Sequence, residues 1–455
     1  MTLSIQNPAT EEIIRELEED TPTSVREKAQ RARAARLGWA KTPLGTRIDM
    51  LKAFRGAIER DKERLAAITT SEVGKPIAQS RNELAALLGR IDFFTDNTAS
   101  TIAPETVFSD ASITERIEHA PLGVVANISA WNYPYFVGAN VFVPALLTGN
   151  TVLYKPSEYA TLTGLAIAEL MHGAGVPDDV FVPIVGGGEA GAALLEQPLD
   201  GVFFTGSYAT GRKVGEAAGR RMLHVQLELG GKDPAYVADD VDVALAAAAT
   251  ADGAFYNTGQ SCCAVERIYV HQRIYDSFVE AFTAEVKRFV IGDPTEDSTY
   301  IGPLTRRAQL GVLAEQVSDA TARGGTVAIG GKRIDRKGFY FEPTVITNVD
   351  HSMAVMRDES FGPIIGIQRV ENDNEAQALM NDTEYGLTAA VYAKERARAE
   401  RILSATEAGT TYWNCCDRVS PRLPWSGRGH SGLGLTLSKY GILAFTRPKA
   451  WHLRG

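Results

Sequence analysis

The chain has 455 residues and a mass of 49.2 kDa, enough for several domains at roughly 100–200 residues each. Its hydrophobic fraction of 44% and charged fraction of 23% are those of an ordinary globular protein rather than a disordered one. Lys and Arg number 47 against 56 Asp and Glu, and the net charge of -9 gives no reason to expect a nucleic-acid partner. No apolar run is long enough to span a bilayer, so we expect no membrane segment.

The amino terminus and the cysteines indicate the compartment. Residues 1–20 are acidic and lack both the basic and the apolar region of a secretory signal. The four cysteines form two adjacent pairs, Cys262-Cys263 and Cys415-Cys416, which cannot build a disulfide framework and lack the C-x-x-C spacing of a zinc site. We therefore expect a cytoplasmic protein that holds no metal.

The hydrophobic pattern indicates an α/β fold. Apolar residues recur at helical spacing between residues 25 and 58, which predicts that the first hundred residues are mainly helical. From residue 124 onward, strands spaced roughly 20 to 30 residues apart with helices between them predict βαβ units in a mostly parallel sheet. The β-branched runs that predict these strands lie at 124–129, 151–154, 180–185, 201–204 and 224–229.

A second alternation begins near residue 235. It contains a predicted strand at 235–238, an alanine-rich helix over 242–254, a strand at 267–270 and a helix after Ile274. This repetition predicts a second α/β domain that starts near residue 230. Residues 445–453 have an extended pattern and are expected to lie at the edge of a sheet.

Two glycine-rich turns are candidates for nucleotide binding. Residues 186–191 match G-x-G-x-x-G between a predicted strand and a predicted helix, which is the context of a dinucleotide fingerprint. Residues 205–211 form a second such turn, where Ser207 and backbone N–H groups could hold a phosphate at a helix N-terminus. Glycines also make ordinary tight turns, so either loop alone could be purely structural. Two such loops on one sheet favour a nucleotide site.

A carboxylate and a thiol are candidates for catalysis. Glu228 ends an apolar strand just before two glycines, a place where a lone glutamate is usually a partner in an ion pair. Cys262 follows the polar turn 257–261 at the end of the alanine-rich helix. A thiol attacks only as the thiolate, and its ordinary pKa of about 8.5 requires a base, a dipole or a cation nearby. The two segments are therefore more informative together than either is alone.

Five short motifs occur along the chain in a fixed order: W-N-Y-P at 131–134, K-P-S-E at 155–158, E-L-G-G at 228–231, G-Q-S-C at 259–262 and E-S-F-G-P at 359–363. Together they resemble the aldehyde dehydrogenase superfamily. Further matches run from N-P-A-T at 7–10 to the G-x-G turn at 432–434, so the resemblance covers essentially the whole chain. It implies a Rossmann-type cofactor domain over 1–112 and 121–230, an α/β catalytic domain over 231–430, and a small β oligomerisation element made of 113–120 and the C-terminal segment 431–455.

The resemblance implies an oxidoreductase that converts an aldehyde to the carboxylic acid with NAD(P). Cys262 would add to the aldehyde as a thiolate and form a thiohemiacetal. The Asn132 side chain and the Cys262 backbone N–H would stabilise the oxyanion. Glu228 would activate the water that hydrolyses the resulting thioester. The other thiols are expected mainly to pack as small apolar residues, and they are Cys263, Cys415 and Cys416.

For the cofactor, the resemblance implies NAD, with NADP possible. Lys155 and Glu158 match the ligands of the adenosine ribose; a carboxylate there would repel a 2′-phosphate, whereas Ser157 could accommodate one. The resemblance places the 186–191 loop at the adenine end rather than around the pyrophosphate. The implied cofactor residues are Trp131, Lys155, Ser157, Glu158, Gly188, Gly206, Ser207, Leu229, Gly230, Glu359 and Phe361.

Two positions depart from the family pattern. Many members carry a lysine and a glutamate where this chain has Val141 and Thr436, so we expect no proton relay from Glu228 through those two residues. Asn140 stands where an aromatic residue often lies.

The resemblance leaves the substrate open. Tyr133, Tyr256 and Trp425 could form an aromatic cage for an aromatic or a quaternary ammonium aldehyde. Arg418 and Arg422 could instead hold the carboxylate of a semialdehyde. Because charged side chains usually face solvent, we expect broad activity on aliphatic and aromatic aldehydes, with semialdehydes and betaine or amino aldehydes as alternatives. The implied pocket residues are Tyr133, Phe136, Asn140, Tyr256, Ser261, Cys263, Asp417, Val419 and Trp425.

The motif residues disfavour two alternative functions. A CoA-acylating aldehyde dehydrogenase typically lacks a base at the position of Glu228, and a non-enzymatic structural member would be free to lose Cys262 or Asn132. All three residues are present. Family members pair through a strand hairpin and the C-terminal strand. Residues 113–120 alternate as such a ribbon and 444–454 could pair with a neighbour's sheet edge, so we expect a homodimer or homotetramer.

Overall fold

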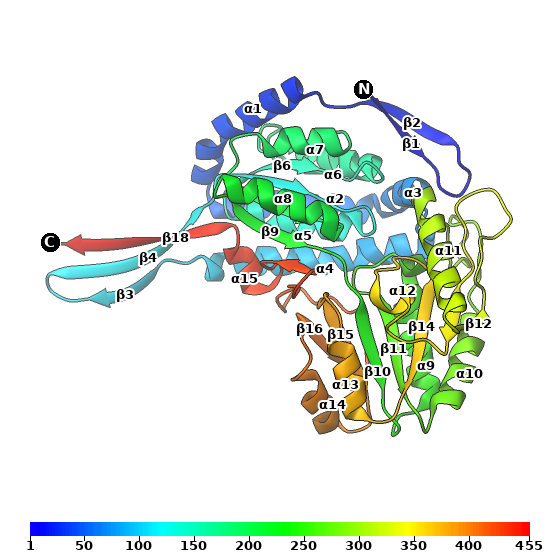
Figure 1. Cartoon of the computed structure of the whole chain (residues 1–455). Coiled ribbons are helices and arrows are strands. Elements are labelled where there is room, and N and C mark those ends of the chain that lie inside the picture. The colour runs from blue at the N-terminus through cyan, green and yellow to red at the C-terminus, as the bar shows by residue number, and fades with distance from the viewer.

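The computed structural model describes all 455 residues and contains two large sheets, each covered by helices on both faces (Figure 1). The first sheet has six strands in the order β17-β9-β8-β5-β6-β7, and all neighbours are parallel except β17 and β9. The five strands predicted from β-branched runs are confirmed. Their bounds are β5 Val124–Ile128, β6 Thr151–Lys155, β7 Phe181–Pro183, β8 Gly201–Thr205 and β9 His224–Glu228, with β17 Gly432–Leu433 added at the edge.

Alternate residues of the first sheet pack against different helices. Val124 and Ala126 face the helices on one side, whereas Val125 faces those on the other, as the two-residue period of a strand requires. The first side is covered by α1 Pro22–Lys41, α7 Gly188–Leu195 and α8 Tyr208–Arg220. The second core contains α2 Leu44–Arg60, α3 Lys62–Val73, α4 Ile77–Thr101, α5 Pro134–Leu147, α6 Thr161–Gly173 and α15 Ser438–Leu443.

The second sheet has seven strands in the order β12-β13-β14-β11-β10-β15-β16 and is parallel except at β12. Its strands are β10 Asp233–Val237, β11 Val265–His271, β12 Thr326–Ile329, β13 Thr344–Thr347, β14 Ile364–Val370, β15 Thr388–Tyr392 and β16 Thr410–Trp413. The predicted alternation after residue 235 is therefore confirmed. One face is covered by α9 Val243–Phe255 and α10 Tyr275–Val286, and the other by α11 Arg307–Ala322, α12 Ala354–Arg357, α13 Asp373–Asn381 and α14 Arg396–Leu403.

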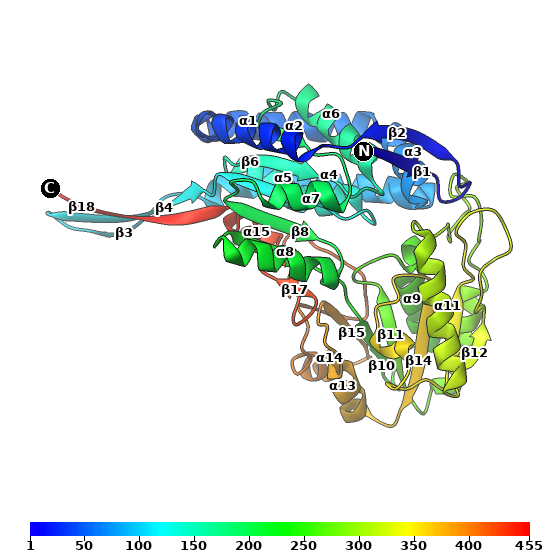
Figure 2. The ribbon, with the colours of Figure 1, turned by 45° about the horizontal axis from the view of Figure 1, so that its top comes forward.

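A three-stranded ribbon projects from the body and carries the C-terminus (Figures 1 and 2). It consists of β3 Glu105–Ser109, β4 Ile113–Pro121 and β18 Thr446–Arg454, in the order β18-β4-β3. The predicted C-terminal strand is confirmed, but it pairs antiparallel with β4 of its own chain, Thr446 opposite Pro121 and Arg454 opposite Ile113. The expectation that this strand pairs with a neighbour's sheet edge stays a prediction, for which the outer edge of β18 is available.

The N-terminus departs from the predicted helical pattern. β1 Thr2–Gln6 and β2 Ile13–Glu18 form an antiparallel hairpin ahead of α1. Asn7 stabilises the turn, since its side-chain oxygen accepts hydrogen bonds from the backbone N–H of Ala9 (2.8 Å) and of Thr10 (3.3 Å). None of the helices combines the length and the apolar character that crossing a bilayer requires.

Candidate active site

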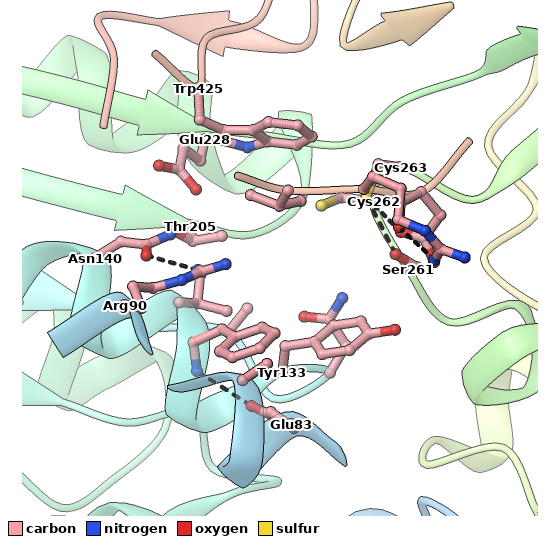
Figure 3. A pocket seen from close by; sticks show the side chains of 18 of the residues that line it. Glu83, Arg90, Tyr133, Asn140, Thr205, Glu228, Ser261, Cys262, Cys263 and Trp425 are labelled. Carbon is pink, nitrogen blue, oxygen red and sulfur yellow. Dashed lines mark hydrogen bonds between the residues drawn. The ribbon is translucent and has the colours of Figure 1, made fainter. Parts of the chain in front are cut away.

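A cavity of about 1220 Å³ lies where the carboxyl ends of β8 and β9 meet the second sheet. In open α/β sheets, ligands bind at such an edge. Cys262, Glu228 and Asn132 all line this cavity. Figure 3 shows Glu228 and Arg90 on one side of the pocket and Ser261, Cys262 and Cys263 on the other.

The turn that positions Cys262 has a constrained backbone. It follows the short 3-10 helix η1 Tyr256–Gly259, in which Asn257 (φ 54°) and Thr258 (φ 58°) adopt left-handed conformations. Such a conformation costs energy, particularly for the β-branched Thr258. The Asn257 backbone N–H donates to Gln79 Oε1 of α4 at 2.9 Å. A Cβ at Gly259 would lie 2.3 Å from the Gly362 carbonyl oxygen, so only glycine fits. These contacts fix the turn against both α4 and the second sheet.

Two hydrogen-bond donors are available beside the Cys262 thiol. Asn132 Nδ2 donates to the Gln260 carbonyl at 3.1 Å, and Asn257 Nδ2 bridges the same carbonyl and the Asn132 carbonyl, both at 3.1 Å. The second N–H of the Asn132 amide and the backbone N–H of Cys262 donate to no protein acceptor. The Asn132 loop and the Cys262 turn are thus joined, with two donors left for an oxyanion.

The four cysteines differ in their surroundings. Contact with Cys262, together with burial, raises the pKa of the Cys263 thiol, whose Sγ donates to Asp417 Oδ1 at 2.9 Å. Burial raises the pKa of Cys416 to about 12 and also raises the pKa of Cys415. All three therefore resist ionisation. Cys262 is the half-buried thiol that lines the cavity, and it is the best-placed nucleophile.

Glu228, at the end of β9, is 8% exposed. Burial raises the pKa of its carboxyl to about 7, while a hydrogen bond from the Thr436 hydroxyl and the charge of Arg90 act in the opposite direction. The Thr436 contact was not expected from the sequence, whereas the absence of a proton relay through Val141 and Thr436 stays a prediction. Val141 is buried and cannot carry a proton, but the hydroxyl at position 436 touches the Glu228 carboxylate directly.

The same cavity continues past Gly206 and Ser207 at the N-terminus of α8. Ser207 caps the helix by accepting from the Thr210 backbone N–H at 3.4 Å. Glu359 Oε1 accepts from the Gly231 backbone N–H at 3.1 Å, and any Cβ at position 230 would collide with that carboxylate. The remaining cofactor positions that line this part of the cavity are Trp131, Leu229, Gly230 and Phe361, with the Trp131 and Phe361 rings edge to face at 5.5 Å.

Four of the expected cofactor residues lie beyond the cavity lining: Lys155, Ser157, Glu158 and Gly188. Lys155 is 4% exposed, and its ammonium donates only to the Pro156 carbonyl at 3.3 Å. It therefore keeps donors for a sugar hydroxyl, which fits an adenosine ribose. At the start of α7 the Gly187 N–H donates to the Glu19 carboxylate at 3.2 Å. A carboxylate of the protein already lies at this glycine loop, which disfavours a pyrophosphate there.

All nine side chains expected in the substrate pocket line the cavity. The Tyr133 and Phe136 rings are parallel, with centroids 6.0 Å apart. The Lys75 ammonium lies 3.8 Å from the centroid of the Tyr133 ring and is paired with Glu83 at 2.5 Å. Because a protein cation already covers one face of Tyr133, that face is not a free wall for a substrate cation. Arg418 and Arg422 are exposed at the cavity, as expected for charged side chains.

One pocket residue was missed from the sequence. Arg90 on α4 is 4% exposed, lines the cavity, and donates from Nη1 to Asn140 Oδ1 at 2.7 Å. A signal was present in the sequence, since Glu83 and Arg90 fall on the same helical stripe as the buried residues Leu87 and Phe94. Charged residues on an apolar stripe are either paired or functional.

Comparison with known proteins gives consistent matches. The model of the aldehyde dehydrogenase family matches residues 1–451. A chloroplastic aminoaldehyde dehydrogenase of Arabidopsis thaliana is 36% identical over 454 residues, covering 97% of this chain and 90% of that protein. The solved structure of a Staphylococcus aureus betaine aldehyde dehydrogenase in complex with NAD+ has a TM-score of 0.96 at 32% identity, over 99% of this chain and 91% of that one. The crystal structure of an NADP-dependent enzyme of E. coli has a TM-score of 0.97 at 31% identity, and the match covers 100% of this chain and 95% of that one.

Proposed function

Because this chain belongs to the aldehyde dehydrogenase family, whose members oxidise aldehydes to acids with NAD(P), we propose that Cys262, Glu228 and Asn132 perform that oxidation here. The observation that carries the proposal is that these three residues share one cavity with the cofactor positions at 206–207 and 359–361. A nucleophile, a base and an oxyanion donor thus face a single space beside the place expected for the nicotinamide.

The net reaction converts an aldehyde, water and NAD+ into the acid, NADH and a proton. The Cys262 thiolate forms a C–S bond to the aldehyde carbon, and the carbonyl oxygen becomes an oxyanion. Asn132 Nδ2 and the Cys262 N–H stabilise that charge, an effect of about 3–4 kcal/mol for one such donor in comparable sites. Bound NAD(P) supplies the acceptor for the hydride released when the C–H bond breaks. The carbonyl re-forms, and the product on Cys262 is a thioester.

Glu228 acts as the base in hydrolysis of the thioester. Its carboxylate takes a proton from water, the water oxygen bonds to the acyl carbon, and the C–S bond breaks to release the acid. A carboxyl whose pKa is raised to about 7 is a stronger base than an ordinary glutamate and is still partly ionised at neutral pH. The Thr436 hydroxyl holds this carboxylate and opposes part of the increase in pKa.

The cofactor is NAD, with NADP possible. We propose that Lys155 and Glu158 hold the adenosine ribose, that Gly206 and Ser207 approach the pyrophosphate, and that Glu359 with Phe361 positions the nicotinamide end. Support comes from the unused donors of Lys155 and from the N-terminus of α8, where backbone N–H groups favour an anion. Glu158 supports a preference for NAD because a carboxylate repels a 2′-phosphate.

The nucleophile is tested by Cys262→Ala, with Cys415→Ala as the matched control because Cys415 lies outside the cavity. We expect the first variant to lose aldehyde-dependent NADH formation while still binding NAD, and the control to keep it. NADH formation by the Cys262→Ala protein at the rate of the control would remove Cys262 from the mechanism.

For the substrate we propose medium-sized aliphatic and aromatic aldehydes. The largely aromatic wall of Tyr133, Phe136, Tyr256 and Trp425 supports this range. A second candidate is an amino or betaine aldehyde, supported by the names of the plant and bacterial relatives. Steady-state kinetics with hexanal, benzaldehyde and betaine aldehyde separate the two candidates.

We also propose a cytoplasmic homo-oligomer. The names of some relatives carry chloroplastic or peroxisomal locations, so the compartment stays a prediction. Assembly is supported by the ribbon, whose outer strands β3 and β18 have unpaired edges. Val107 and Phe108 on β3 are about half exposed, as is Leu453 on β18, and exposed apolar edge strands favour pairing with another chain.

A further inference from the structure

We propose that Arg90 and Asn140 form a subsite for a carboxylate on the substrate, so that the enzyme prefers aldehydes whose other end is anionic. The proposal rests on the function above, because the aldehyde carbon must meet Cys262 in the same cavity. It narrows the broad substrate range to ω-oxo acids. The evidence for it is the burial of these two residues, their contacts and the hydrogen-bond donors that they leave unused.

Arg90 is a buried cation without a carboxylate in contact. The residue is 4% exposed, and no acidic oxygen lies within 4.0 Å of its guanidinium. Two buried cations of this chain do contact a carboxylate: Lys75 pairs with Glu83 at 2.5 Å and Lys232 with Glu266 at 2.7 Å. The buried Lys155 and Arg267, like Arg90, do not, but their charged groups donate to backbone carbonyl oxygens, whereas Arg90 donates only to Asn140. Burial lowers the pKa of Arg90 to about 10, so it is still charged at neutral pH. The charges of Glu228 and Glu83 oppose this decrease in the pKa without contacting the guanidinium, and a ligand anion in direct contact would stabilise the buried cation further.

The hydrogen bond between Arg90 and Asn140 determines what the pair can bind. A guanidinium only donates, so the amide must turn its oxygen toward Arg90 Nη1 at 2.7 Å. The Asn140 amide nitrogen then has no protein acceptor, and the other guanidinium nitrogens of Arg90 also have none. Both residues line the cavity (Figure 3). The two side chains therefore present only hydrogen-bond donors to the cavity. This suits a carboxylate, whereas an ammonium group would find no acceptor on them.

The carboxylates around Arg90 are already engaged. Glu83 accepts from Lys75 and from the backbone N–H groups of Tyr135 and Phe136. Glu228 accepts from Thr436, and Asp417 accepts from Cys263. None of these carboxylates lies within salt-bridge distance of the Arg90 guanidinium.

Packing holds the guanidinium in place. The Arg90 guanidinium carbon lies 4.1 Å from the centroid of the Phe136 ring, which restrains the planar group against one wall of the cavity. Preorganised donors bind a ligand more tightly because less side-chain entropy is lost. The Lys75 ammonium over Tyr133 is paired with Glu83, so Arg90 is the cation of this wall that disfavours a cationic aldehyde.

The test compares aldehydes of equal chain length with and without a terminal carboxylate. The kcat/KM values of succinic semialdehyde and adipic semialdehyde are measured against those of butanal and hexanal. We expect the wild-type enzyme to prefer at least one semialdehyde over its uncharged counterpart by tenfold or more. In Arg90→Met this ratio should fall by about tenfold, which corresponds to roughly 1.4 kcal/mol. Arg90→Lys should lose part of the preference for the semialdehyde.

Arg288→Met is the control, because Arg288 is an exposed arginine that lies outside the cavity. It should leave the ratio within about twofold of the wild type. A wild-type enzyme that oxidises hexanal without preferring either semialdehyde would overturn the subsite while leaving the proposed function intact. Failure to oxidise any aldehyde would count against the proposed function itself. Equal losses for charged and uncharged aldehydes in Arg90→Met would also overturn the subsite, because Arg90 would then act through Glu228.

A measurement on the wild type alone covers the case in which Arg90→Met does not fold. Adipate should inhibit hexanal oxidation at a concentration at least tenfold lower than hexanoate does, because only adipate has a second carboxylate for Arg90 and Asn140. Equal inhibition by the two acids would overturn the proposal.

Discussion

The Thr436 hydroxyl donates a hydrogen bond to the Glu228 carboxylate, across 208 residues of sequence. Thr436 is held by two backbone hydrogen bonds to Trp425, of 2.8 and 2.9 Å. Trp425 in turn lines the substrate cavity. The proposed base is therefore anchored, through Thr436, to the backbone of a residue that supplies a wall of the substrate pocket.

Removing this hydrogen bond should shift the pH dependence of turnover. The bond lowers the pKa of Glu228, so Thr436→Val raises it. Because the carboxylate must be ionised to act as base, activity near pH 7 should fall, and the acid limb of kcat should move to higher pH by about one unit, since hydrogen bonds to charged groups are worth about 1.5–3 kcal/mol. A kcat profile across neutral pH measures this. Thr326→Val, on an exposed strand, is the control. A profile identical to the wild type would show that Thr436 does not tune the base.

Glu228→Gln should separate the two half-reactions. Hydride transfer needs the Cys262 thiolate and the oxyanion donors, whereas thioester hydrolysis needs the base. We expect a rapid release of about one equivalent of NADH per chain, followed by a much slower steady state, in stopped-flow absorbance. Wild-type steady-state turnover in this variant would exclude Glu228 as the base.

Glu158 should set the choice of cofactor. The wild-type kcat/KM should be higher with NAD than with NADP, because the half-buried carboxylate repels a 2′-phosphate. Glu158→Ala should reduce the ratio of kcat/KM with NAD to kcat/KM with NADP by about tenfold, which corresponds to roughly 1.4 kcal/mol. Glu189→Ala, a carboxylate in the glycine loop at the start of α7, serves as a comparison. A wild-type preference for NADP would contradict this assignment.

The ribbon should mediate assembly. Light scattering of the wild type should give at least twice the chain mass of 49.2 kDa. Phe108→Asp on β3 should weaken the assembly by placing a charge on an apolar edge. Leu245→Asp is the control, since Leu245 is 70% exposed and lies on α9, which covers the second sheet. A stable wild-type monomer at micromolar concentration would refute the proposal.

The fold could be predicted where local pattern and tertiary environment agree. The strands β5, β6, β8 and β9 are short β-branched or aromatic runs, and both faces of their sheet are buried, so apolar content alone marks them. The β1–β2 hairpin was missed because residues 13–18 are rich in glutamate and read as part of a helical region. Their extended conformation depends on pairing with residues 2–6 around the Asn7 turn.

The residues of the candidate site likewise divide into those that a local pattern predicts and those that depend on tertiary contacts. Cys262, Glu228 and Asn132 lie in local motifs, and such motifs can be recognised without knowing what surrounds them. Arg90 belongs to no motif, and its importance comes from Asn140 on another helix and from the cavity between them. The bond between Thr436 and Glu228 likewise joins distant segments. Contacts of this kind follow from the packing of whole elements, and no local pattern predicts them.

The most direct test of the mechanism is to locate the acyl group in the stalled Glu228→Gln enzyme. After a single turnover with hexanal and NAD, peptide mapping by mass spectrometry should find one hexanoyl group per chain, attached to Cys262 and absent from Cys263. The Cys262→Ala/Glu228→Gln double variant should carry none. A hexanoyl group on Cys263, or no covalent acyl group in an enzyme that has produced its equivalent of NADH, would contradict the assignment of Cys262 as the nucleophile.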